Sequence, residues 1–452
     1  MKITSINPTN NLLIKEYDIF SDQSVEEEIL NTHNEFSLWK KFSFNKRKEI
    51  LLKISQKLKN DINVHAEMIT KEMGKPIKQS RAEILKCVWV IEYYAENAAD
   101  FLKSKTIKSD YAESYVQYDP LGVILGVMPW NFPYWQVFRF IAPSLMAGNT
   151  CVLKHASNVS GCALLIEKLV HSCSEYKSIF KVLLISSSQV EKVIKNPYVK
   201  AVTLTGSEYA GSEVAMRAGK EIKKTVLELG GSDCFIVLDD ADIKLAAKTS
   251  ILARFLNSGQ SCIAAKRFLV HENVYDEFIS IVLKSIKALN VGNPMLKETD
   301  IGPLAKNNFI TEIDVLVQNS IKKGAKCLLG GKFSDSFYEP TLLIDVKEDM
   351  DVFTCETFGP IFCISKILDS EEAIRLANNS DYGLGGSIWT KNIEKAKNMA
   401  SLIETGAVFI NDMTKSDPRL PFGGVKKSGY GIELSKYGIR EFVNMKTVVI
   451  ND

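Results

Sequence analysis

Val123-Ile124-Leu125 is the first of a series of short apolar segments that decides the fold. Similar segments follow at 150–153, 182–185, 202–204 and 226–229, and each is separated from the next by enough chain for a helix. Short apolar runs between helix-length segments are typical of strands that are buried on both faces. The series therefore predicts a doubly wound α/β domain built on a parallel sheet.

The segments on either side extend this α/β pattern. Residues 45–103 carry apolar side chains at helix spacing, and a second series of apolar segments begins at 234–238. It continues through 268–270 and a predicted helix at 274–289. We expect a second α/β domain that starts near Gly230.

Two further segments, 114–118 and 445–450, have the alternating or apolar pattern of strands. The second has no evident partner in its own neighbourhood of the sequence. Together the two segments would extend a sheet across a subunit boundary. The alternative is that 445–450 is an ordinary terminal strand packed on its own domain.

Composition excludes several classes of protein. With 452 residues, of which 46% are hydrophobic, the chain can fill two or three cores. Its 56 basic and 54 acidic residues give a net charge of +2, which points to a small-molecule partner and away from nucleic acid and membrane surfaces. The nine cysteines form no Cys-x-x-Cys pair and the five histidines no His-Glu-x-x-His motif, so we expect a reducing compartment and no metal site.

The N-terminal segment and one uncharged stretch bear on location. The first residues lack the apolar stretch of a signal peptide and the arginine-rich character of a transit peptide, so a cytoplasmic protein is expected. Residues 120–138 carry no charge and are long enough to cross a bilayer. Because Pro120, Pro129 and Pro133 interrupt them, we interpret them as a buried strand and a bend.

Cys262 ends the run Asn257-Ser258-Gly259-Gln260-Ser261-Cys262, which is small and uncharged. Cysteines are usually packing residues, but these neighbours permit the close approach of a substrate. A thiolate attacks an aldehyde to give an oxyanion that needs fixed hydrogen-bond donors. The Cys262 backbone N–H is one candidate donor, and Asn131, held between Trp130 and Pro133, is the other.

Glu228 ends an apolar strand and precedes two glycines, so its carboxylate is expected at a strand end, where catalytic groups lie in open α/β sheets. A partly desolvated glutamate there could take a proton from water. The alternative is a salt-bridged carboxylate at the junction of two domains.

Residues 205–211 follow a strand and open a predicted helix, whose amides, including those of Gly206 and Ser207, suit a phosphate. A simple capped helix start explains this segment equally well. Lys154, at a strand end, and Ser157 are candidates for contact with an adenine ribose. Glu356 is a candidate for the other ribose.

These motifs, in this order, resemble the NAD(P)-dependent aldehyde dehydrogenase superfamily over nearly the whole chain. The resemblance implies a Rossmann-type cofactor domain, an α/β catalytic domain with a nucleophilic cysteine, and a small β oligomerisation element in a homodimer or homotetramer. It implies domains at 1–229, interrupted by a hairpin at 104–120, at 230–432, and at 433–452. The motifs that carry it are Asn7-Pro8 and residues 129–133, 228–231, 259–262, 356–360 and 421–429.

By this likeness Cys262 is the nucleophile, Glu228 the general base and Asn131 the oxyanion donor, while Glu356 and Phe358 contact the nicotinamide ribose. The reaction then passes through a thiohemiacetal and a thioester on Cys262, and water activated by Glu228 releases the acid. The cofactor-binding residues implied are Trp130, Lys154, Ser157, Gly206, Ser207, Glu356 and Phe358.

Residues 153–158 and 416–421 resemble bacterial succinate-semialdehyde dehydrogenases. Ser157 stands where NAD-preferring relatives often carry a glutamate, so NADP is the expected cofactor, with NAD possible. Arg139 occupies the position of a carboxylate-binding arginine in similar enzymes. Leu256 replaces a second arginine of animal relatives, for which Arg419 or Lys415 would compensate, and Trp135 is expected to wall the tunnel. A surface Arg419 in a solvated ion pair is the alternative.

Rival functions remain at this point. Within the family they are the oxidation of glutarate semialdehyde or lactaldehyde, and a CoA-acylating reaction, which the presence of Glu228 disfavours. A cysteine hydrolase would need a histidine partner, and no histidine lies in a comparable motif.

Overall fold

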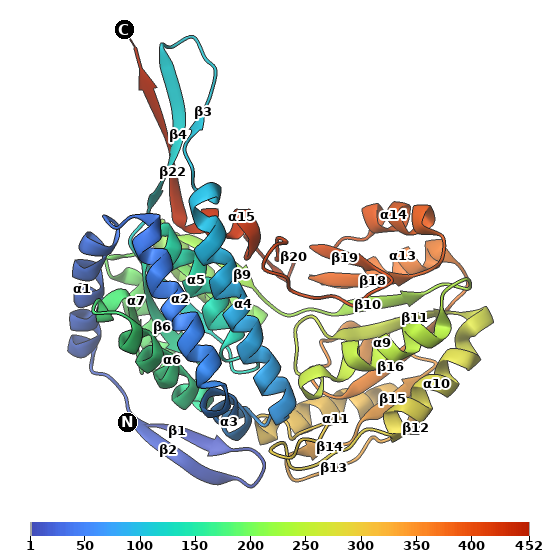
Figure 1. Cartoon of the computed structure of the whole chain (residues 1–452). Helices are drawn as coiled ribbons and strands as arrows, with labels where there is room; N and C mark the ends of the chain where they lie inside the picture. The colour runs from blue at the N-terminus through green and yellow to red at the C-terminus, as the bar shows by residue number, and fades with distance from the viewer. Residues whose placement is uncertain (1, 452) are drawn as a thin grey trace.

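The computed structural model describes residues 2–451 and contains two large sheets, each with its own helices, and a narrow sheet that projects from one side (Figure 1). The N-terminal half, blue to green, forms most of one body, and the yellow to orange part forms the other. Residues 1 and 452, the outer ends of the first and last predicted domains, lie outside the described residues. The predicted α/β class is confirmed.

The first large sheet consists of β5 (Val123–Met128), β6 (Thr150–His155), β7 (Phe180–Val182), β8 (Val199–Thr205), β9 (Lys224–Glu228) and β21 (Gly429–Tyr430). Their order is β21-β9-β8-β5-β6-β7, and all neighbours are parallel except β21 and β9. The chain runs from the central β5 to β6 and β7, then returns to β8 and β9 on the other side. A topological switch point, where ligands bind in such sheets, therefore lies between β5 and β8.

The predicted strands of this sheet all exist, with one shift. The segment predicted at 182–185 overlaps β7 only at Val182, where that strand ends. The chain turns tightly after this point, because the Ile185 N–H bonds to the Leu183 carbonyl at 3.0 Å.

The helices around this sheet follow from their sequence patterns. Gly74 ends one helix with a φ of 79°, a conformation that suits glycine, and Pro76 precedes the next. The helices are α1 (Asp22–Trp39), α2 (Phe44–Asn60), α3 (Ile62–Met73), α4 (Ile77–Phe101), α5 (Trp135–Ala147), α6 (Ser160–Cys173), α7 (Val190–Lys195) and α8 (Glu208–Lys220), with short 3₁₀ turns η1 (Ser157–Val159), η2 (Lys177–Ile179) and η3 (Ser187–Gln189).

Every residue of α5 is buried, which explains its apolar composition. Together with β5 and the loop between them, it accounts for the uncharged segment 120–138. Among residues 2–451, no helix has both the length and the apolar composition to cross a membrane.

The second large sheet consists of β10 (Asp233–Val237), β11 (Ala265–His271), β12 (Lys326–Leu329), β15 (Thr341–Ile344), β16 (Ile361–Ile367), β18 (Gly385–Trp389) and β19 (Ala407–Ile410). Their order is β12-β15-β16-β11-β10-β18-β19, with only β12 antiparallel to its neighbour. This sheet begins close to the position predicted for a second domain. The domain boundaries stay a prediction. One strand of the predicted domain 230–432, β21, pairs with the first sheet.

Helices also surround the second sheet, including the one predicted at 274–289. They are α9 (Ile243–Phe255), α10 (Tyr275–Lys287), α11 (Asn307–Lys322), α12 (Asp351–Thr354), α13 (Ser370–Asn378) and α14 (Ile393–Leu402), with η4 (Leu256–Gly259) and η5 (Glu272–Val274). Near the C-terminus, α15 (Ser435–Gly438) and η6 (Ile439–Phe442) lead back toward the first body (Figure 1).

The projecting sheet contains both segments, 114–118 and 445–450, that are expected to share a sheet. It consists of β3 (Lys105–Thr106), β4 (Glu113–Pro120) and the terminal β22 (Val443–Ile450), in the order β22-β4-β3. The terminal strand therefore has a partner in its own chain, with Val448 opposite Tyr115. More than 300 residues separate the two strands, and the extension of this sheet across a subunit boundary stays a prediction.

The remaining strands form small two-stranded sheets. They are β1 (Lys2–Asn7) with β2 (Leu12–Asp18), β13 (Phe333–Ser334) with β14 (Phe337–Tyr338), and β17 (Tyr382–Gly383) with β20 (Val425–Lys426).

Candidate active site

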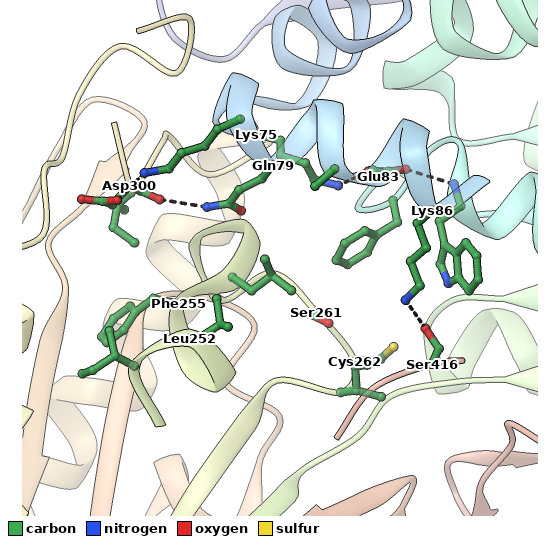
Figure 2. A pocket seen from close by; sticks show the side chains of 18 of the residues that line it. Lys75, Gln79, Glu83, Lys86, Leu252, Phe255, Ser261, Cys262, Asp300 and Ser416 are labelled. Carbon is green, nitrogen blue, oxygen red and sulfur yellow. Dashed lines mark hydrogen bonds and ion pairs between the residues drawn. The ribbon is translucent and has the colours of Figure 1, made fainter. Parts of the chain in front are cut away.

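Cys262 lies on a strained loop between α9 and β11. Three successive residues of this loop, Asn257, Ser258 and Gly259, have left-handed φ values of 56°, 56° and 76°. A Cβ atom on Gly259 would collide with the carbonyl oxygen of Gly359. Strain of this kind persists where the surrounding structure holds it. Figure 2 shows the result, with the Cys262 sulfur facing the space between the loop and α4.

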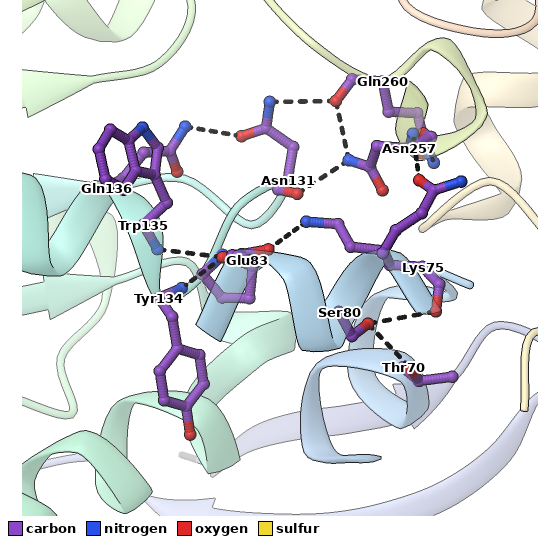
Figure 3. Close-up of polar contacts among 12 residues, drawn as sticks. Thr70, Lys75, Ser80, Glu83, Asn131, Tyr134, Trp135, Gln136, Asn257 and Gln260 are labelled. Carbon is purple, nitrogen blue, oxygen red and sulfur yellow. Dashed lines mark hydrogen bonds and ion pairs between the residues drawn. The ribbon is translucent and has the colours of Figure 1, made fainter. Parts of the chain in front are cut away.

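Hydrogen bonds hold this loop against the β5–α5 loop that carries Asn131. The Asn257 side-chain amide donates to the carbonyls of Asn131 at 2.8 Å and Gln260 at 3.0 Å. The Gln260 side chain donates to the Asn257 carbonyl at 3.2 Å and accepts from the Ala305 N–H at 2.9 Å. The two loops are therefore fixed to each other (Figure 3).

The Asn131 amide is oriented from both ends. Its Nδ2 donates to the Gln260 carbonyl at 3.2 Å, and its Oδ1 accepts from Gln136 Nε2 at 3.0 Å. Nδ2 carries a second hydrogen. The Cys262 backbone N–H makes no hydrogen bond within residues 2–451. The two predicted oxyanion donors thus both keep a hydrogen for a ligand.

A buried ion pair supports the β5–α5 loop from beneath. Lys75 pairs with Glu83, and both side chains are almost fully buried. The Glu83 Oε1 accepts the backbone N–H groups of Tyr134 at 2.9 Å and Trp135 at 3.0 Å (Figure 3). The Lys75 ammonium lies 3.8 Å from the centre of the Phe132 ring. The sequence did not predict this pair, because neither residue stands in a recognisable motif.

Glu228 ends β9, as predicted, and its side chain is buried. Its Oε2 accepts a hydrogen bond of 3.1 Å from Arg139, while its Oε1 has no partner within residues 2–451. The same guanidinium pairs with Glu433 at 2.7 Å and donates to Thr205 Oγ1 at 3.1 Å. One carboxylate oxygen of Glu228 is therefore held and the other is free.

Burial and charge set the ionisation of this cluster. Burial raises the pKa of Glu433 to about 7, although Arg139 acts in the opposite direction. Burial acts to lower the pKa of Arg139, but the carboxylates of Glu433 and Glu228 outweigh it and raise the pKa. Arg139 therefore stays protonated, and its charge is offset by carboxylates on two elements.

Burial raises the pKa of the Cys262 thiol well above its usual range. The negative charge of the adjacent Glu228 raises it further, whereas Lys266 and Arg139 act in the opposite direction. The thiol is therefore protonated at neutral pH in this arrangement. A thiolate can form when a neighbouring base removes the proton, and the Glu228 carboxylate is the base in contact.

Lys266, fully buried on β11, ties the cysteine loop to Glu356. Its ammonium donates to the carbonyls of Ser261 at 2.8 Å and Cys262 at 2.6 Å, and pairs with Glu356 Oε1 at 3.2 Å. Glu356 also accepts the Gly231 N–H at 3.1 Å. Burial raises the pKa of Glu356, although Lys266 opposes the shift. The sequence interpretation missed Lys266, whose only signal was its position in a buried strand.

Two cavities meet at Cys262. The first, of about 480 Å³, runs between α4, α5 and α9 and reaches Cys262 beside Phe422. The second, of about 740 Å³, lies at the carboxyl ends of β5 and β8 and reaches the same cysteine beside Asn131. A substrate and a cofactor entering from opposite sides would therefore meet at the sulfur. Within residues 2–451, no group of His, Cys, Asp or Glu residues could hold a metal ion.

Comparison with known proteins agrees with this geometry. Residues 1–448 match the Aldehyde dehydrogenase family. This chain belongs to that family. It is 46% identical, over the full length of both chains, to the probable succinate-semialdehyde dehydrogenase [NADP(+)] of Synechocystis, and 44% identical to succinate-semialdehyde dehydrogenase [NADP(+)] 1 of Mycobacterium tuberculosis, again over both full lengths. The crystal structure of the Streptococcus pyogenes succinic semialdehyde dehydrogenase, in complex with NADP+, matches with a TM-score of 0.97, 39% identity and full coverage of both chains.

In this aldehyde dehydrogenase, five of the seven predicted cofactor residues line the second cavity: Trp130, Gly206, Ser207, Glu356 and Phe358. Trp130 stacks on Phe309, with ring centres 5.1 Å apart, and meets Phe358 edge-on at 5.7 Å. Ser207 also caps α8, since its hydroxyl accepts the Ala210 N–H at 3.3 Å. The capped helix start and the cavity wall are thus the same feature.

The other two predicted cofactor residues lie outside the lining of that cavity. Lys154 is buried at the end of β6, and Ser157 is exposed at the start of η1. Burial lowers the pKa of Lys154, and the positive charge of Lys306 lowers it further. Lys306 thus adds a second cation to this region, which the sequence interpretation did not include.

Only some of the predicted substrate residues line the first cavity. Trp135 and Arg139 line the first cavity of the dehydrogenase, together with Leu256. Arg419 does not line this cavity. Its side chain is 65% exposed and pairs with Asp417. The alternative of a solvated ion pair therefore describes Arg419, and its predicted substrate role has no support in this arrangement. Lys415 is likewise exposed and pairs with Asp412.

Proposed function

We propose that this dehydrogenase oxidises succinate semialdehyde to succinate with NADP+, through an acyl intermediate on Cys262. The observation that carries the proposal is the full-length identity of 46% to a protein named as a probable succinate-semialdehyde dehydrogenase [NADP(+)]. The two cavities that meet at the cysteine support it, because they admit an aldehyde and a cofactor from opposite sides.

In the proposed mechanism, the thiol of Cys262 passes its proton through Glu228 to solvent, which leaves Glu228 ionised again, and the resulting thiolate attacks the aldehyde carbon. The oxyanion accepts hydrogen bonds from Asn131 Nδ2 and the Cys262 N–H. The bound nicotinamide supplies the hydride acceptor. Loss of hydride leaves a thioester on Cys262, and Glu228 then takes a proton from the water that attacks it. Succinate leaves, and the thiol is restored.

The second cavity fits a nicotinamide dinucleotide. Its volume of about 740 Å³ lies at the switch point of the first sheet, and its wall combines an α8 N-terminus with an aromatic cluster. Glu356, held by Lys266 and the Gly231 N–H, offers a fixed acceptor for ribose hydroxyls.

The preference for NADP over NAD rests on charge near the β6 end. Ser157 brings no negative charge, and Lys154 lies close enough to Lys306 for the two charges to interact. An added 2′-phosphate would relieve the repulsion between these two lysines. The sequence-based expectation of an NADP preference is thus supported by a cation that it did not use.

The direct test measures absorbance at the reduced-nicotinamide band on mixing the protein with NADP+ and an aldehyde. Succinate semialdehyde should give the highest kcat/KM in a panel with glutarate semialdehyde, lactaldehyde and butanal. A higher kcat/KM for lactaldehyde or butanal would move the activity to another substrate class.

We also propose a cytoplasmic homo-oligomer, assembled through the projecting sheet. Among residues 2–451, no strand pairs with the outer edge of its terminal strand, which exposes Met445, Val449 and Ile450. All nine cysteines are free, which is consistent with a reducing compartment. Light scattering should give a dimeric or tetrameric mass, and Val449→Asp should lower it. A monomeric mass for the unmodified chain would exclude the assembly, and subcellular fractionation tests the location.

A further inference from the structure

The charged side chains that line the first cavity are nearly all compensated. Lys78 pairs with Asp300 at the outer part of the cavity, and Arg139 pairs with Glu228 and Glu433. The same cavity is lined by the Lys75–Glu83 pair, described above, and by Lys248 on α9, which makes no ion pair within residues 2–451 but is exposed to solvent. The remaining cation of the lining is on α4.

That cation, Lys86, makes no ion pair with a carboxylate within residues 2–451. Its ammonium donates a hydrogen bond of 2.7 Å to Ser416 Oγ and lies 4.2 Å from the centre of the Trp135 ring. Figure 2 shows it extending from α4 toward Ser416, on the side of the cavity where Cys262 lies. Lys86 is thus a charge without a counter-ion in a largely apolar cavity that ends at the nucleophile.

We propose that Lys86 binds the carboxylate of the aldehyde substrate and selects for an aldehyde with an anionic end. The inference rests on the proposed function and names the residue that supplies the net positive charge. Two ammonium hydrogens remain free beside the bond to Ser416, and the Ser416 hydroxyl can donate as well. A carboxylate that accepts these hydrogens would give Lys86 the counter-ion that the protein itself does not provide.

The surroundings of Lys86 make this binding sensitive to pH. Burial lowers the pKa of Lys86 to about 8, and the charge of Arg139 on α5 acts in the same direction. Cys87 and Glu83 on α4, and Asp417 in the loop after β19, act in the opposite direction. Above pH 8 the free enzyme therefore loses this charge, whereas Arg139 keeps its own.

The first experiment compares kcat/KM for succinate semialdehyde and for butanal, an uncharged aldehyde of the same chain length. Lys86→Met should reduce the value for succinate semialdehyde by about 30-fold, chiefly through KM, because a buried charge contact is lost. The loss with butanal should be far smaller. Lys78→Met removes an equal charge from the same cavity, but one already paired, and should change the ratio of the two values by less than about threefold.

The second experiment follows the same ratio with pH. Since ionisation of Cys262 and Glu228 affects both aldehydes, it cancels in the ratio. For the wild-type enzyme the ratio should fall above pH 8, and for Lys86→Arg it should stay level to at least pH 9.5, because arginine remains charged. If the wild-type ratio does not change with pH, the inference is wrong, and Arg139 is the cation that binds the substrate carboxylate.

The outcomes separate this inference from the proposed function. If the wild type has the same kcat/KM for butanal as for succinate semialdehyde, the proposed function fails. If the wild type prefers succinate semialdehyde while Lys86→Met lowers both activities equally, the function stands and the role of Lys86 is wrong. Equal Tm values for Lys86→Met, Lys86→Arg and wild type, and a weaker inhibition by succinate for Lys86→Met alone, would support the binding role.

Discussion

The two cavities that meet at Cys262 differ in how the sequence builds them. Part of the wall of the cofactor cavity comes from short segments beside strands, at 129–131, 205–207 and 229–230 and at Glu356 and Phe358, and another part comes from one face of α11. The wall of the substrate cavity comes from single side chains on α4, α5, α9 and the loop after β19. A motif that must shape a backbone leaves a local signal in the sequence, whereas a helix face that supplies one side chain does not. The cofactor side is thus the predictable half of this active site.

The largest expected effect concerns Cys262, one of the two residues that line both cavities. Cys262→Ala should lower acid production by at least about 10⁴-fold, since no other group can carry the acyl intermediate. The comparison predicts that cofactor binding survives, because the wall of the second cavity stays intact. Stopped-flow assays measure the rate of the reaction, and quenching of protein fluorescence by NADP+ measures cofactor binding. Acid production at the wild-type rate would exclude the thioester pathway.

Glu228→Gln should separate the two halves of the reaction. Glu228 receives the thiol proton in acylation and the water proton in deacylation, but removing its negative charge lowers the pKa of the Cys262 thiol and so offsets part of the loss in acylation, whereas deacylation should slow by about 10³-fold. A burst of reduced cofactor close to one per active site, followed by slow turnover, is the expected trace. An unchanged steady-state rate would remove Glu228 from the mechanism.

Arg139→Ala tests which side of the site this residue serves. Because its guanidinium is the counter-ion of both Glu228 and Glu433, we expect a loss of about 100-fold for charged and uncharged aldehydes alike. The pKa of Glu433, about 7 with Arg139 in place, should also rise, since the opposing charge is lost. A loss confined to succinate semialdehyde would instead confirm the substrate contact predicted from the sequence.

The smallest effect is expected at the outer end of the cofactor side. Ser157→Glu should lower kcat/KM for NADP+ by about 10-fold, because a carboxylate near Lys154 would repel a 2′-phosphate. The value for NAD+ should change less or rise. Ser157→Ala serves as the uncharged control. Equal changes for both cofactors would place the 2′-phosphate away from η1.

Several features of the site were missed for identifiable reasons. Glu83, which pairs with Lys75, accepts hydrogen bonds from two backbone N–H groups of another segment. These contacts depend on how α4 packs against α5. Lys266 lies in a largely apolar strand, and nothing in the neighbouring sequence indicates that it binds the cysteine loop and Glu356. For Arg419 the sequence left a substrate contact and a solvated ion pair as alternatives, and the structure shows the exposed pair with Asp417.

By itself, the sequence predicted the α/β class, five strands of the first large sheet and the first two strands of the second, and it proposed Cys262, Glu228 and Asn131 as nucleophile, base and amide. These depend on local patterns: apolar periodicity, small residues at tight turns, and strand ends. Only the tertiary structure decided which cations are already neutralised, that Arg139 holds Glu228 and Glu433, that β22 pairs with β4, and that Lys86 lies in the cavity without a counter-ion. The reason is physical. Whether a charge is free depends on which distant segments surround it, and that information exists only once the chain has folded.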